Sequence, residues 1–325
     1  MTEEIVGVIL AAGRGTRMFP FDSHWPKPLL PILGKPLLQH QIEMMKSVGI
    51  RTVYVVIGYL GYEIVRMLGT GESLEVRTEY IEQTEMLGIA NAVGRLEPHV
   101  QKPFLLCLGD IFFVTDELPR MIEELARENT KAVLASKFEP RPEMIRRNFA
   151  IMTAEGNCVK RVIEKPRYIQ NQLKGCGIYL FAPEIFDAIR RTPRTAMRDE
   201  YEITESIQIM IDDGHRVVHS EIIEDDLNLT VPQDLLNINL LELRRRGFVN
   251  YFSEPGKHLE DKLTQCVIGR DVVIGEGASL LGCVVFDHSV IPARTDLAKT
   301  IVTPERLIPC TAVEEEYSWP GRECW

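Results

Sequence analysis

The residues best suited to chemistry form a glycine-rich loop near the N-terminus, directly after an apolar run that is typical of a buried strand. The loop consists of Leu10, Ala11, Ala12, Gly13, Arg14, Gly15, Thr16 and Arg17. Two glycines allow a tight turn that points backbone N–H groups at phosphate oxygens, and the arginines add positive charge there. A purely structural turn is the alternative. Neither common phosphate motif is matched, because residue 18 is Met and no GKS or GKT ending follows.

A lysine held between two prolines follows this loop. Lys27 lies in the sequence Pro26-Lys27-Pro28, and proline restricts both its own backbone and that of the residue before it. A lone loop lysine would normally be solvated. A lysine fixed close to a phosphate-type loop can instead serve as a second clamp on a phosphate.

The stretch from Leu10 to Pro31 as a whole resembles the signature of the sugar-1-phosphate nucleotidyltransferases. That family includes glucose-1-phosphate thymidylyltransferase, UDP-sugar pyrophosphorylases and mannose-1-phosphate guanylyltransferase. The resemblance implies a Mg²⁺-dependent enzyme that joins a nucleoside triphosphate to a sugar 1-phosphate and releases pyrophosphate. It also implies that Arg17, Lys27 and Asp110 are the catalytic residues, because they match the family's motifs in order.

Two later segments resemble the family's base-reading and metal-binding elements. Gln83 precedes Gly88 by the family's spacing, and its amide could offer a donor and an acceptor to the edge of uracil or thymine. A solvated loop glutamine is the alternative. Asp110 follows a buried, strand-like run, where a carboxylate can hold Mg²⁺ or can simply cap a turn.

The second metal ligand is less sharply indicated. Alignment of the segment around Pro232 with the family's pattern puts Asn228 where an aspartate is usual, and an amide oxygen can also bind Mg²⁺. Asp225 and Asp226 lie close by in the sequence and compete for the role.

The sugar side of the resemblance rests on Glu164-Lys165, followed by a strand with small residues. Glu164 would accept hydrogen bonds from sugar hydroxyls and Lys165 would hold the sugar phosphate, although an exposed charge pair is the alternative. Gly175 and Gly177 are expected to leave room for the sugar ring. Ala150 stands where glycine is usual, and Gly175 replaces the asparagine of N-acetylglucosamine-specific members, so the identity of the sugar stays open.

The elements that position these residues alternate along the chain. Short apolar runs predict strands at 5–10, 52–57, 104–108, 131–135 and 177–181. Helical spacing predicts helices at 37–47, 62–68, 89–96, 117–128, 183–191, 203–213 and 232–246. This alternation predicts an α/β fold, a Rossmann-like, mainly parallel mixed sheet flanked by helices, with ligands at the carboxyl ends of strands.

The C-terminal part has a different residue pattern. From Val267 onward an aliphatic residue recurs every six positions beside small residues, a pattern typical of a short left-handed β-helix. A pair of hairpins with glycine turns is the alternative. We therefore expect a nucleotidyltransferase domain at residues 1–247 and a β-helix-like domain at residues 248–325.

The overall composition limits the classes of partner that the protein is expected to bind. A formal charge of −10 disfavours a general nucleic-acid or membrane binder, and the chain lacks an apparent signal peptide. Seven cysteines without a CxxC pair favour a reducing compartment. We expect a cytoplasmic enzyme that acts on a nucleoside triphosphate and a sugar 1-phosphate, and a homo-oligomer.

Three other readings stay open at this point. Gln83 favours dTTP or UTP, but a GTP-dependent mannose-1-phosphate-type guanylyltransferase also commonly carries a β-helix tail. A non-catalytic regulatory paralogue that binds nucleotide sugars is the second; the presence of Arg17, Lys27 and Asp110 weighs against it. A bifunctional enzyme with an acetyl-transferring tail is the third, and it is disfavoured because the tail is short.

Overall fold

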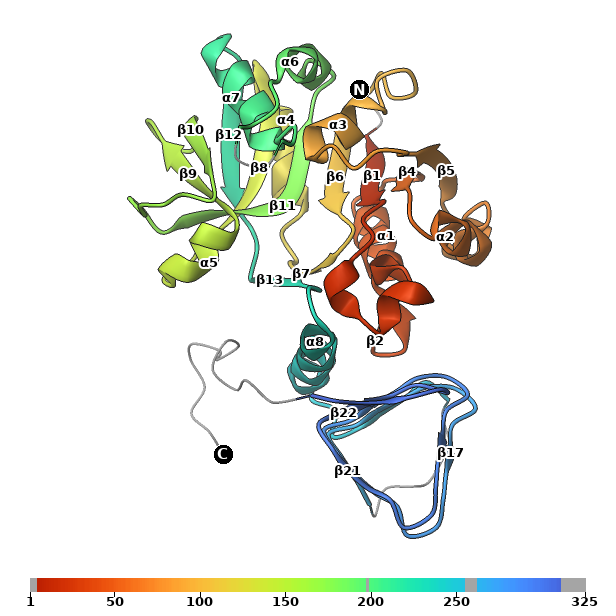
Figure 1. Ribbon diagram of the computed structural model, residues 1–325. Helices are drawn as coiled ribbons and strands as arrows, with labels where there is room; N and C mark the ends of the chain where they lie inside the picture. The colour runs from red at the N-terminus through yellow and green to blue at the C-terminus, as the bar shows by residue number, and fades with distance from the viewer. Residues whose placement is uncertain (1–4, 197–198, 255–261, 311–325) are drawn as a thin grey trace. The chain divides into compact units, whose positions relative to one another are not determined.

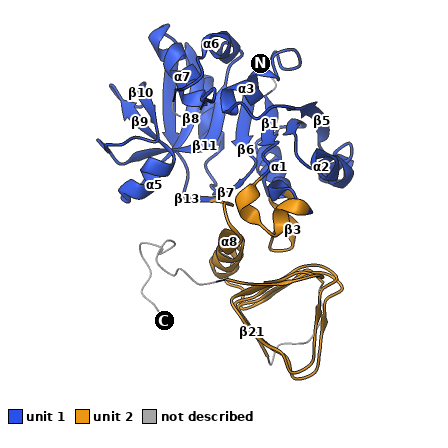
Figure 2. Ribbon diagram, viewed as in Figure 1, with its two compact units in different colours: residues 1–14, 24–28, 38–227 blue, residues 15–23, 29–37, 228–325 orange. Residues whose placement is uncertain are grey.

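The computed structural model describes residues 5–196, 199–254 and 262–310 (Figure 1). The chain divides into two compact units, coloured separately in Figure 2. The first comprises residues 1–14, 24–28 and 38–227, and the second comprises residues 15–23, 29–37 and 228–325. Two N-terminal segments therefore group with the C-terminal part of the chain. The simpler division at residue 247 stays a prediction.

The first unit is built on a nine-stranded sheet with the main order β10-β9-β11-β6-β1-β4-β5, and β8 pairs with both β11 and β12. The strands are β1 (Val6–Ala11), β4 (Thr52–Ile57), β5 (Arg77–Glu82), β6 (Phe104–Leu108), β8 (Thr130–Phe138), β9 (Phe149–Thr153), β10 (Val159–Glu164), β11 (Leu173–Phe181) and β12 (Arg216–Glu221). From β5 to β6 all pairs are parallel, whereas β11 runs antiparallel to β6, β8 and β9. The sheet is therefore mixed, with the predicted parallel strands at one side.

Helices connect these strands and cover both faces of the sheet (Figure 1). They are α1 (Leu37–Ser47), α2 (Gly61–Leu68), α3 (Ile89–Gly94), α4 (Pro119–Leu125), α5 (Pro142–Arg147), α6 (Ile185–Arg191) and α7 (Ile203–Asp212), with the short helices η3 (Lys27–Leu29) and η4 (Glu72–Leu74). A separate pair, β7 (Ile111–Val114) with β13 (Asp225–Asn228), lies below the sheet in Figure 1.

The alternation of side chains along β1 explains the layers. Val6 and Val8 belong to the core cluster that contains the apolar residues of α3, α6 and α7. Gly7 points to the other face, where an added Cβ would lie 2.6 Å from the sulfur of Met45 in α1. Because successive side chains of a strand point to opposite faces, one apolar strand serves two helical layers. This is why β1 is apolar throughout.

The second unit contains a parallel β-helix, visible as the triangular coil in Figure 1. Its faces are the strand sets β14-β16-β19-β22-β23, β15-β18-β21 and β17-β20. Strands of successive coils pair in parallel with an offset of 17 residues, as in Leu263 opposite Leu280 and Val273 opposite Val290. The β-helix prediction is confirmed and the alternative of two hairpins is wrong. Only the last described pair, β22 with β23, is antiparallel. The hand of the coil stays a prediction.

The remaining elements of this unit are short, apart from one helix. They are η1 (Thr16–Met18), η2 (Phe21–Ser23), β2 (Pro31–Ile32), β3 (Lys35–Pro36), α8 (Pro232–Arg245), β14 (Tyr251–Phe252), β15 (Leu263–Thr264), β16 (Val267–Ile268), β17 (Val273–Ile274), β18 (Ser279–Leu281), β19 (Val284–Val285), β20 (Val290–Ile291), β21 (Asp296–Ala298), β22 (Thr300–Val302) and β23 (Leu307–Pro309).

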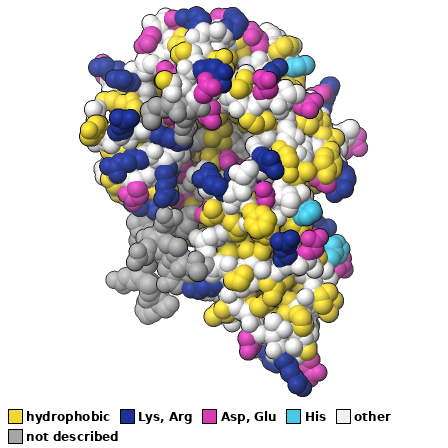
Figure 3. All heavy atoms as spheres, viewed as in Figure 1, with side chains coloured by type: hydrophobic (Ala, Val, Ile, Leu, Met, Phe, Trp, Pro, Cys, Tyr) yellow, Lys and Arg dark blue, Asp and Glu magenta, His cyan; other side chains and the backbone are white. Residues whose placement is uncertain are grey.

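Charged side chains of both signs occur across the face shown in Figure 3, so the net negative charge does not gather there into one acidic patch. Within the described residues, no helix has both the length and the apolar character needed to cross a membrane.

Candidate active site

The glycine-rich loop leaves the carboxyl end of β1, as predicted. Gly15 adopts a left-handed conformation with φ 67°, and its carbonyl accepts a hydrogen bond from the N–H of Met18 that opens η1. A residue with a Cβ would be strained in that conformation. Gly13 is exposed, and no atom lies within 4 Å of the place its Cβ would take. One glycine therefore makes the turn and the other leaves open space over the backbone.

An aromatic side chain holds Arg14 in the first unit. The Arg14 guanidinium lies 4.9 Å from the centre of the Tyr59 ring, and the Tyr59 N–H donates to the Ala12 carbonyl at 3.3 Å. A cation over an aromatic face is attracted by the ring's negative face. Tyr59 was not singled out by the sequence, because a tyrosine after a strand carries no signal of its own. Arg17 is exposed and belongs to the second unit.

Lys27 and Asp110 meet in the first unit. The Lys27 Nζ lies 3.2 Å from Asp110 Oδ2, and the lysine side chain is 12% exposed whereas the carboxylate is 45% exposed. Pro26 and Pro28, both buried, hold the lysine as η3 begins. Two residues that are far apart in the chain, each predicted to be catalytic, thus form one ion pair. The second carboxylate oxygen has no partner among the described residues.

The turn that carries Asp110 is fixed by a buried glutamine. Gln41 of α1 is 2% exposed, and its Nε2 donates to the carbonyls of Leu108 and Ile111, both at 2.8 Å. Both neighbours are acceptors, so only the NH₂ end of the amide can face them. Gly109 donates its N–H to the Leu10 carbonyl at 2.9 Å. Nothing in the sequence distinguishes Gln41 from other polar residues of an amphipathic helix.

Gln83 follows β5 and is 5% exposed. Its backbone N–H donates to the Ile57 carbonyl at 2.8 Å, but its side-chain amide has no hydrogen-bond partner within the described chain. Buried amides are normally paired, so an unpaired one is poised for a ligand. Gly88, with φ 104°, lies so close to Tyr201 that a Cβ would be 2.6 Å from its carbonyl oxygen. Gly88 therefore has a packing role in this structure.

The residues predicted for the sugar side lie on the antiparallel half of the sheet. Ala150 is buried in β9, and Glu164 ends β10, where it accepts a hydrogen bond from the Thr204 hydroxyl at 3.4 Å. Lys165 is exposed, with φ 41°, and its N–H donates to the Asn148 carbonyl at 2.8 Å. The structure thus brings Glu164 and Lys165 to the end of one strand.

The glycines of β11 accommodate protein side chains. A Cβ on Gly175 would lie 1.9 Å from the Phe149 ring, and one on Gly177 would lie 2.8 Å from side-chain atoms of Leu108 and Ile111. In this structure both glycines pack closely against protein side chains, and the expectation that they leave room for a sugar ring stays a prediction. Phe149, which stacks on Tyr179 at 6.0 Å, fills the space beside Gly175. The packing of Phe149 beside Gly175 could not be predicted from sequence, because the two residues lie on different strands.

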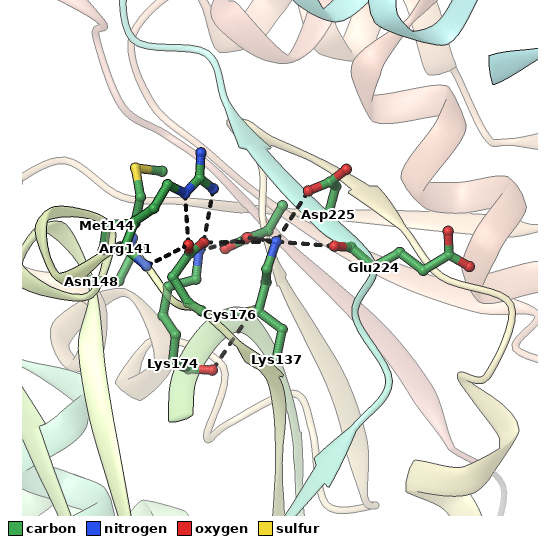
Figure 4. Close-up of polar contacts among 10 residues, drawn as sticks. Lys137, Arg141, Met144, Asn148, Lys174, Cys176, Glu224 and Asp225 are labelled. Carbon is green, nitrogen blue, oxygen red and sulfur yellow. Dashed lines mark hydrogen bonds and ion pairs between the residues drawn. The ribbon is translucent and has the colours of Figure 1, made fainter. Parts of the chain in front are cut away.

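Asp225 belongs to a charged cluster with Lys137 and Lys174 (Figure 4), and Asp226 joins the cluster through its ion pair with Lys174. Lys174 Nζ lies 2.6 Å from Asp226 Oδ1, and these two side chains are 0% and 1% exposed. Lys137 Nζ lies 3.1 Å from Asp225 Oδ1. Both carboxylates are thus bound to ammonium groups, as Asp110 is, but Asp226 is in addition almost fully buried, which fits a metal ligand poorly. The cluster also contains the Glu139–Arg141 pair, so positive and negative groups balance.

The electrostatics of this cluster are those of a stable ion pair. Burial by itself lowers the pKa of the Lys174 ammonium, but Asp226, Cys176 and Glu139 together outweigh that effect and the pKa is raised overall. Burial, with the charge of Asp226 next, raises the pKa of the neighbouring Cys176 thiol. The lysine is therefore charged and the thiol neutral at neutral pH. A lysine within the apolar run of β11 was the one sequence signal of the cluster.

Groups of three or more His, Cys, Asp or Glu side chains that could hold a metal ion are absent from the described residues. Mg²⁺ in proteins is commonly held by one or two carboxylates together with substrate phosphates. Asp110, with an uncommitted carboxylate oxygen, fits that mode. Asn228 is half-buried at the start of the second unit's C-terminal segment, and its part in metal binding stays a prediction.

The fold is a mixed α/β sheet, and its strand ends carry a glycine-rich loop, a lysine–aspartate pair and the uncommitted amide of a buried glutamine. Together these features are typical of a nucleotide-binding α/β enzyme. The family model described as nucleotidyl transferase matches residues 6–226. The chain therefore belongs to the nucleotidyltransferase family, and the protein is a nucleotidyltransferase.

Individual relatives agree with this assignment. A glucose-1-phosphate thymidylyltransferase of Streptomyces antibioticus is 30% identical over 312 residues, covering 91% of this chain and 80% of the relative. The UTP–glucose-1-phosphate uridylyltransferase AglF of Haloferax volcanii is 31% identical over 227 residues, covering 70% of this chain and 92% of the relative. A solved structure of a putative glucose-1-phosphate thymidylyltransferase from Bacillus anthracis is 26% identical, with a TM-score of 0.65 over 73% of this chain and 94% of that one.

Proposed function

We propose that the protein transfers a nucleotidyl group from a pyrimidine nucleoside triphosphate, dTTP or UTP, to a sugar 1-phosphate. The observation that carries the proposal is the ion pair between Lys27 and Asp110, 3.2 Å apart, beside the loop that leaves β1. A fixed cation and a part-exposed carboxylate at the strand ends are the groups needed to bring polyphosphates and a divalent metal together. The names of the relatives make glucose 1-phosphate the first sugar to test.

The reaction balances without a general base. An oxygen of the sugar phosphate, already ionised at neutral pH, attacks the α-phosphorus of the triphosphate. A new P–O bond forms, the bond to the β-phosphate oxygen breaks, and pyrophosphate leaves with its electron pair. Positioning and charge neutralisation then supply most of the catalysis. Arg17 and the loop N–H groups hold the triphosphate, while Lys27 and Lys165 offset the repulsion between two anions.

Asp110 is the proposed holder of Mg²⁺, with Asn228 as the proposed second ligand. The metal, when bound, would neutralise charge on the α-phosphate. Oxygen ligands of these types suit Mg²⁺. Asp226, which is 1% exposed and bound by Lys174, is poorly suited to the same role, whereas Asp225 stays a competitor for it.

The buried amide of Gln83 supports the choice of a pyrimidine. Its donor and acceptor match the N3–H and O4 groups of uracil or thymine, and burial raises the cost of leaving them unpaired. Selection among sugars is proposed to involve Ala150, Glu164, Lys165 and Gly177. A cytoplasmic location and a homo-oligomeric state stay predictions of the sequence.

The decisive experiment is a matrix of nucleoside triphosphates against sugar 1-phosphates with Mg²⁺, read by pyrophosphate release. We expect dTTP or UTP with glucose 1-phosphate to give the fastest release. GTP with mannose 1-phosphate as the only active pair would establish the guanylyltransferase alternative. Tight nucleotide-sugar binding without release for any pair would establish a regulatory protein.

A further inference from the structure

We propose that Phe286 of the β-helix and Asn239 of α8 position the second half of the glycine-rich loop, residues 15–17, and thereby support triphosphate binding. The inference rests on the proposed function of the loop. Gly15, Thr16 and Arg17 belong to the same compact unit as α8 and the β-helix, shown in orange in Figure 2. Two separate contacts within that unit carry the argument.

The first contact joins α8 to the hairpin of β2 and β3. Asn239 of α8 is 0% exposed, and its Oδ1 accepts the Leu33 N–H at 2.8 Å while its Nδ2 donates to the Pro31 carbonyl at 2.9 Å. Leu33 has φ 45°, a conformation that is uncommon for a leucine. One buried amide thus satisfies a donor and an acceptor of the hairpin turn and fixes its position on the helix.

The second contact lies directly beyond the loop. Phe21, 0% exposed, stacks on Phe286 of the β-helix, with ring centroids 5.6 Å apart and an interplanar angle of 19°. Phe286 follows β19, and its N–H donates to the Val302 carbonyl of the next coil at 2.8 Å. The ring that receives Phe21 is therefore built into the coil itself.

Both contacts lie on the C-terminal side of the exposed Arg17. The residue after it, Met18, is 0% exposed, and its N–H donates to the Gly15 carbonyl at 2.8 Å. A segment that is buried at Met18 and Phe21 has little freedom at Arg17, so its guanidinium is presented from a fixed backbone. Fixed placement of charge lowers the cost of binding an anion, because less order must be created on binding.

The test compares three variants of the full-length protein by their steady-state constants. Phe286→Ala removes the ring beneath Phe21, and Phe286→Leu keeps apolar volume without the stacked ring. Leu280→Ala is the matched control, because Leu280 is 1% exposed in a core cluster made only of coil residues. Retention of fold is checked by circular dichroism and thermal unfolding.

We expect Phe286→Ala to raise the KM for the nucleoside triphosphate about tenfold, and Phe286→Leu to raise it less, because loosening a pre-ordered loop costs on the order of one rotamer-rich group's entropy. The KM for the sugar phosphate should stay within about twofold of wild type. Leu280→Ala should lower the melting temperature without raising the triphosphate KM. Equal triphosphate KM values in Phe286→Ala and Leu280→Ala would overturn the proposal.

The proposed function can fail separately. If the wild-type protein releases no pyrophosphate but binds a nucleoside triphosphate, the same comparison is made on its dissociation constant by isothermal titration calorimetry. Weaker triphosphate binding by Phe286→Ala, with normal binding by Leu280→Ala, would then still show that the coil positions the loop. Unchanged binding would reject it.

Discussion

At the scale of single residues, the ion pair of Lys27 with Asp110 is the centre of the proposed site. Lys27→Ala should lower kcat at least about a hundredfold, because it removes a fixed cation from the place where charge develops. Pyrophosphate release measures the effect. Lys46→Ala is the matched control, since Lys46 forms an ion pair with Glu75 at the surface of the same unit. Near wild-type turnover of Lys27→Ala would contradict the assignment.

Gln41 defines a second prediction at this scale. Gln41→Met keeps the side-chain length but removes both donors to the Leu108 and Ile111 carbonyls, which flank Asp110. Outer partners of metal-binding groups typically contribute roughly 10- to 100-fold to affinity or activity. We expect kcat to fall and the half-saturating Mg²⁺ concentration to rise within that range. Direct Mn²⁺ titration, followed by electron paramagnetic resonance, measures binding independently of turnover.

The control for this variant comes from the same helix. Gln39→Leu removes a hydrogen bond from Gln39 Nε2 to Glu43, one turn along α1, and does not involve the Asp110 turn. Its metal dependence should match wild type. A Gln41→Met protein that is folded and shows the metal dependence of Gln39→Leu would remove Gln41 from the site.

Residue types and order singled out Lys27 and Asp110, which the structure brings together, but not the residues that surround them. Lys27 and Asp110 were each predicted, and their ion pair depends on a fold that brings two loops together. Gln41 and Tyr59 carry no signal in the sequence, because their importance lies only in what they touch. The packing of Gly175 against Phe149 could not be predicted for the same reason, since the Phe149 ring comes from another strand.

At the scale of elements, the buried pair Lys174–Asp226 links β11 to β13. Removing one partner leaves a buried charge uncompensated, so Lys174→Met should lower the free energy of unfolding by about 3–5 kcal/mol. The double variant Lys174→Met/Asp226→Leu should be within about 1 kcal/mol of wild type, or more stable, because a buried ion pair seldom exceeds its desolvation cost. Urea unfolding measures both. A double variant that is as unstable as the single one would contradict this account.

Glu242 of α8 is expected to make the free energy of unfolding depend on pH. Burial tends to raise the pKa of Glu242, but Arg245 and Arg246 hydrogen-bond its carboxylate and lower the pKa overall. A lowered pKa in the folded state stabilises the protein above the unfolded pKa of about 4.3, and the gain is lost as pH falls through the folded value. Glu242→Gln should therefore be less stable than wild type at pH 7 and equally stable once the pH is well below 4.

Urea midpoints at the two pH values test this expectation, and Glu128→Gln, an exposed carboxylate, is the control. Its stability difference from wild type should be near zero at both pH values. A Glu242→Gln deficit that persists in acid would show that packing, and not the ion pairs, is responsible.

Elements with strong periodicity were predicted closely, as with α1 at Leu37–Ser47 and β4 at Thr52–Ile57. The strands that escaped prediction include β5, β10 and β12, which read RTEYIE, VKRVIE and RVVHSE. In the sheet β5 and β10 end the strand order, and β12 pairs with β8 and has an isolated bridge, Val218 with Cys158, outside the named strands. An edge strand has one side open to solvent and tolerates charge, so its pattern lacks the continuous apolar run of a central strand.

At the scale of the whole molecule, the grouping of residues into units has a consequence for the tail. The N-terminal segments 15–23 and 29–37 find their buried contacts in α8 and the β-helix, through Asn239 and Phe286. The six-residue repeat indicated a β-helix, but nothing in the sequence indicated that Phe21, just after the glycine-rich loop, stacks on a residue of that coil. Contacts between distant segments of a chain cannot be predicted from a local sequence pattern.

A chain shortened to residues 1–247, the domain predicted from sequence, should therefore fail as an independent enzyme. It keeps Asn239 but loses Phe286, so Phe21, 0% exposed in the whole protein, loses the ring on which it stacks. Loss of a large aromatic contact from a core costs about 3–5 kcal/mol. We expect a lower melting temperature, binding of a hydrophobic dye, and a raised KM for the nucleoside triphosphate. If the shortened chain matches full-length protein in triphosphate KM and melting temperature, the division at residue 247 is correct and the coil is dispensable for the loop.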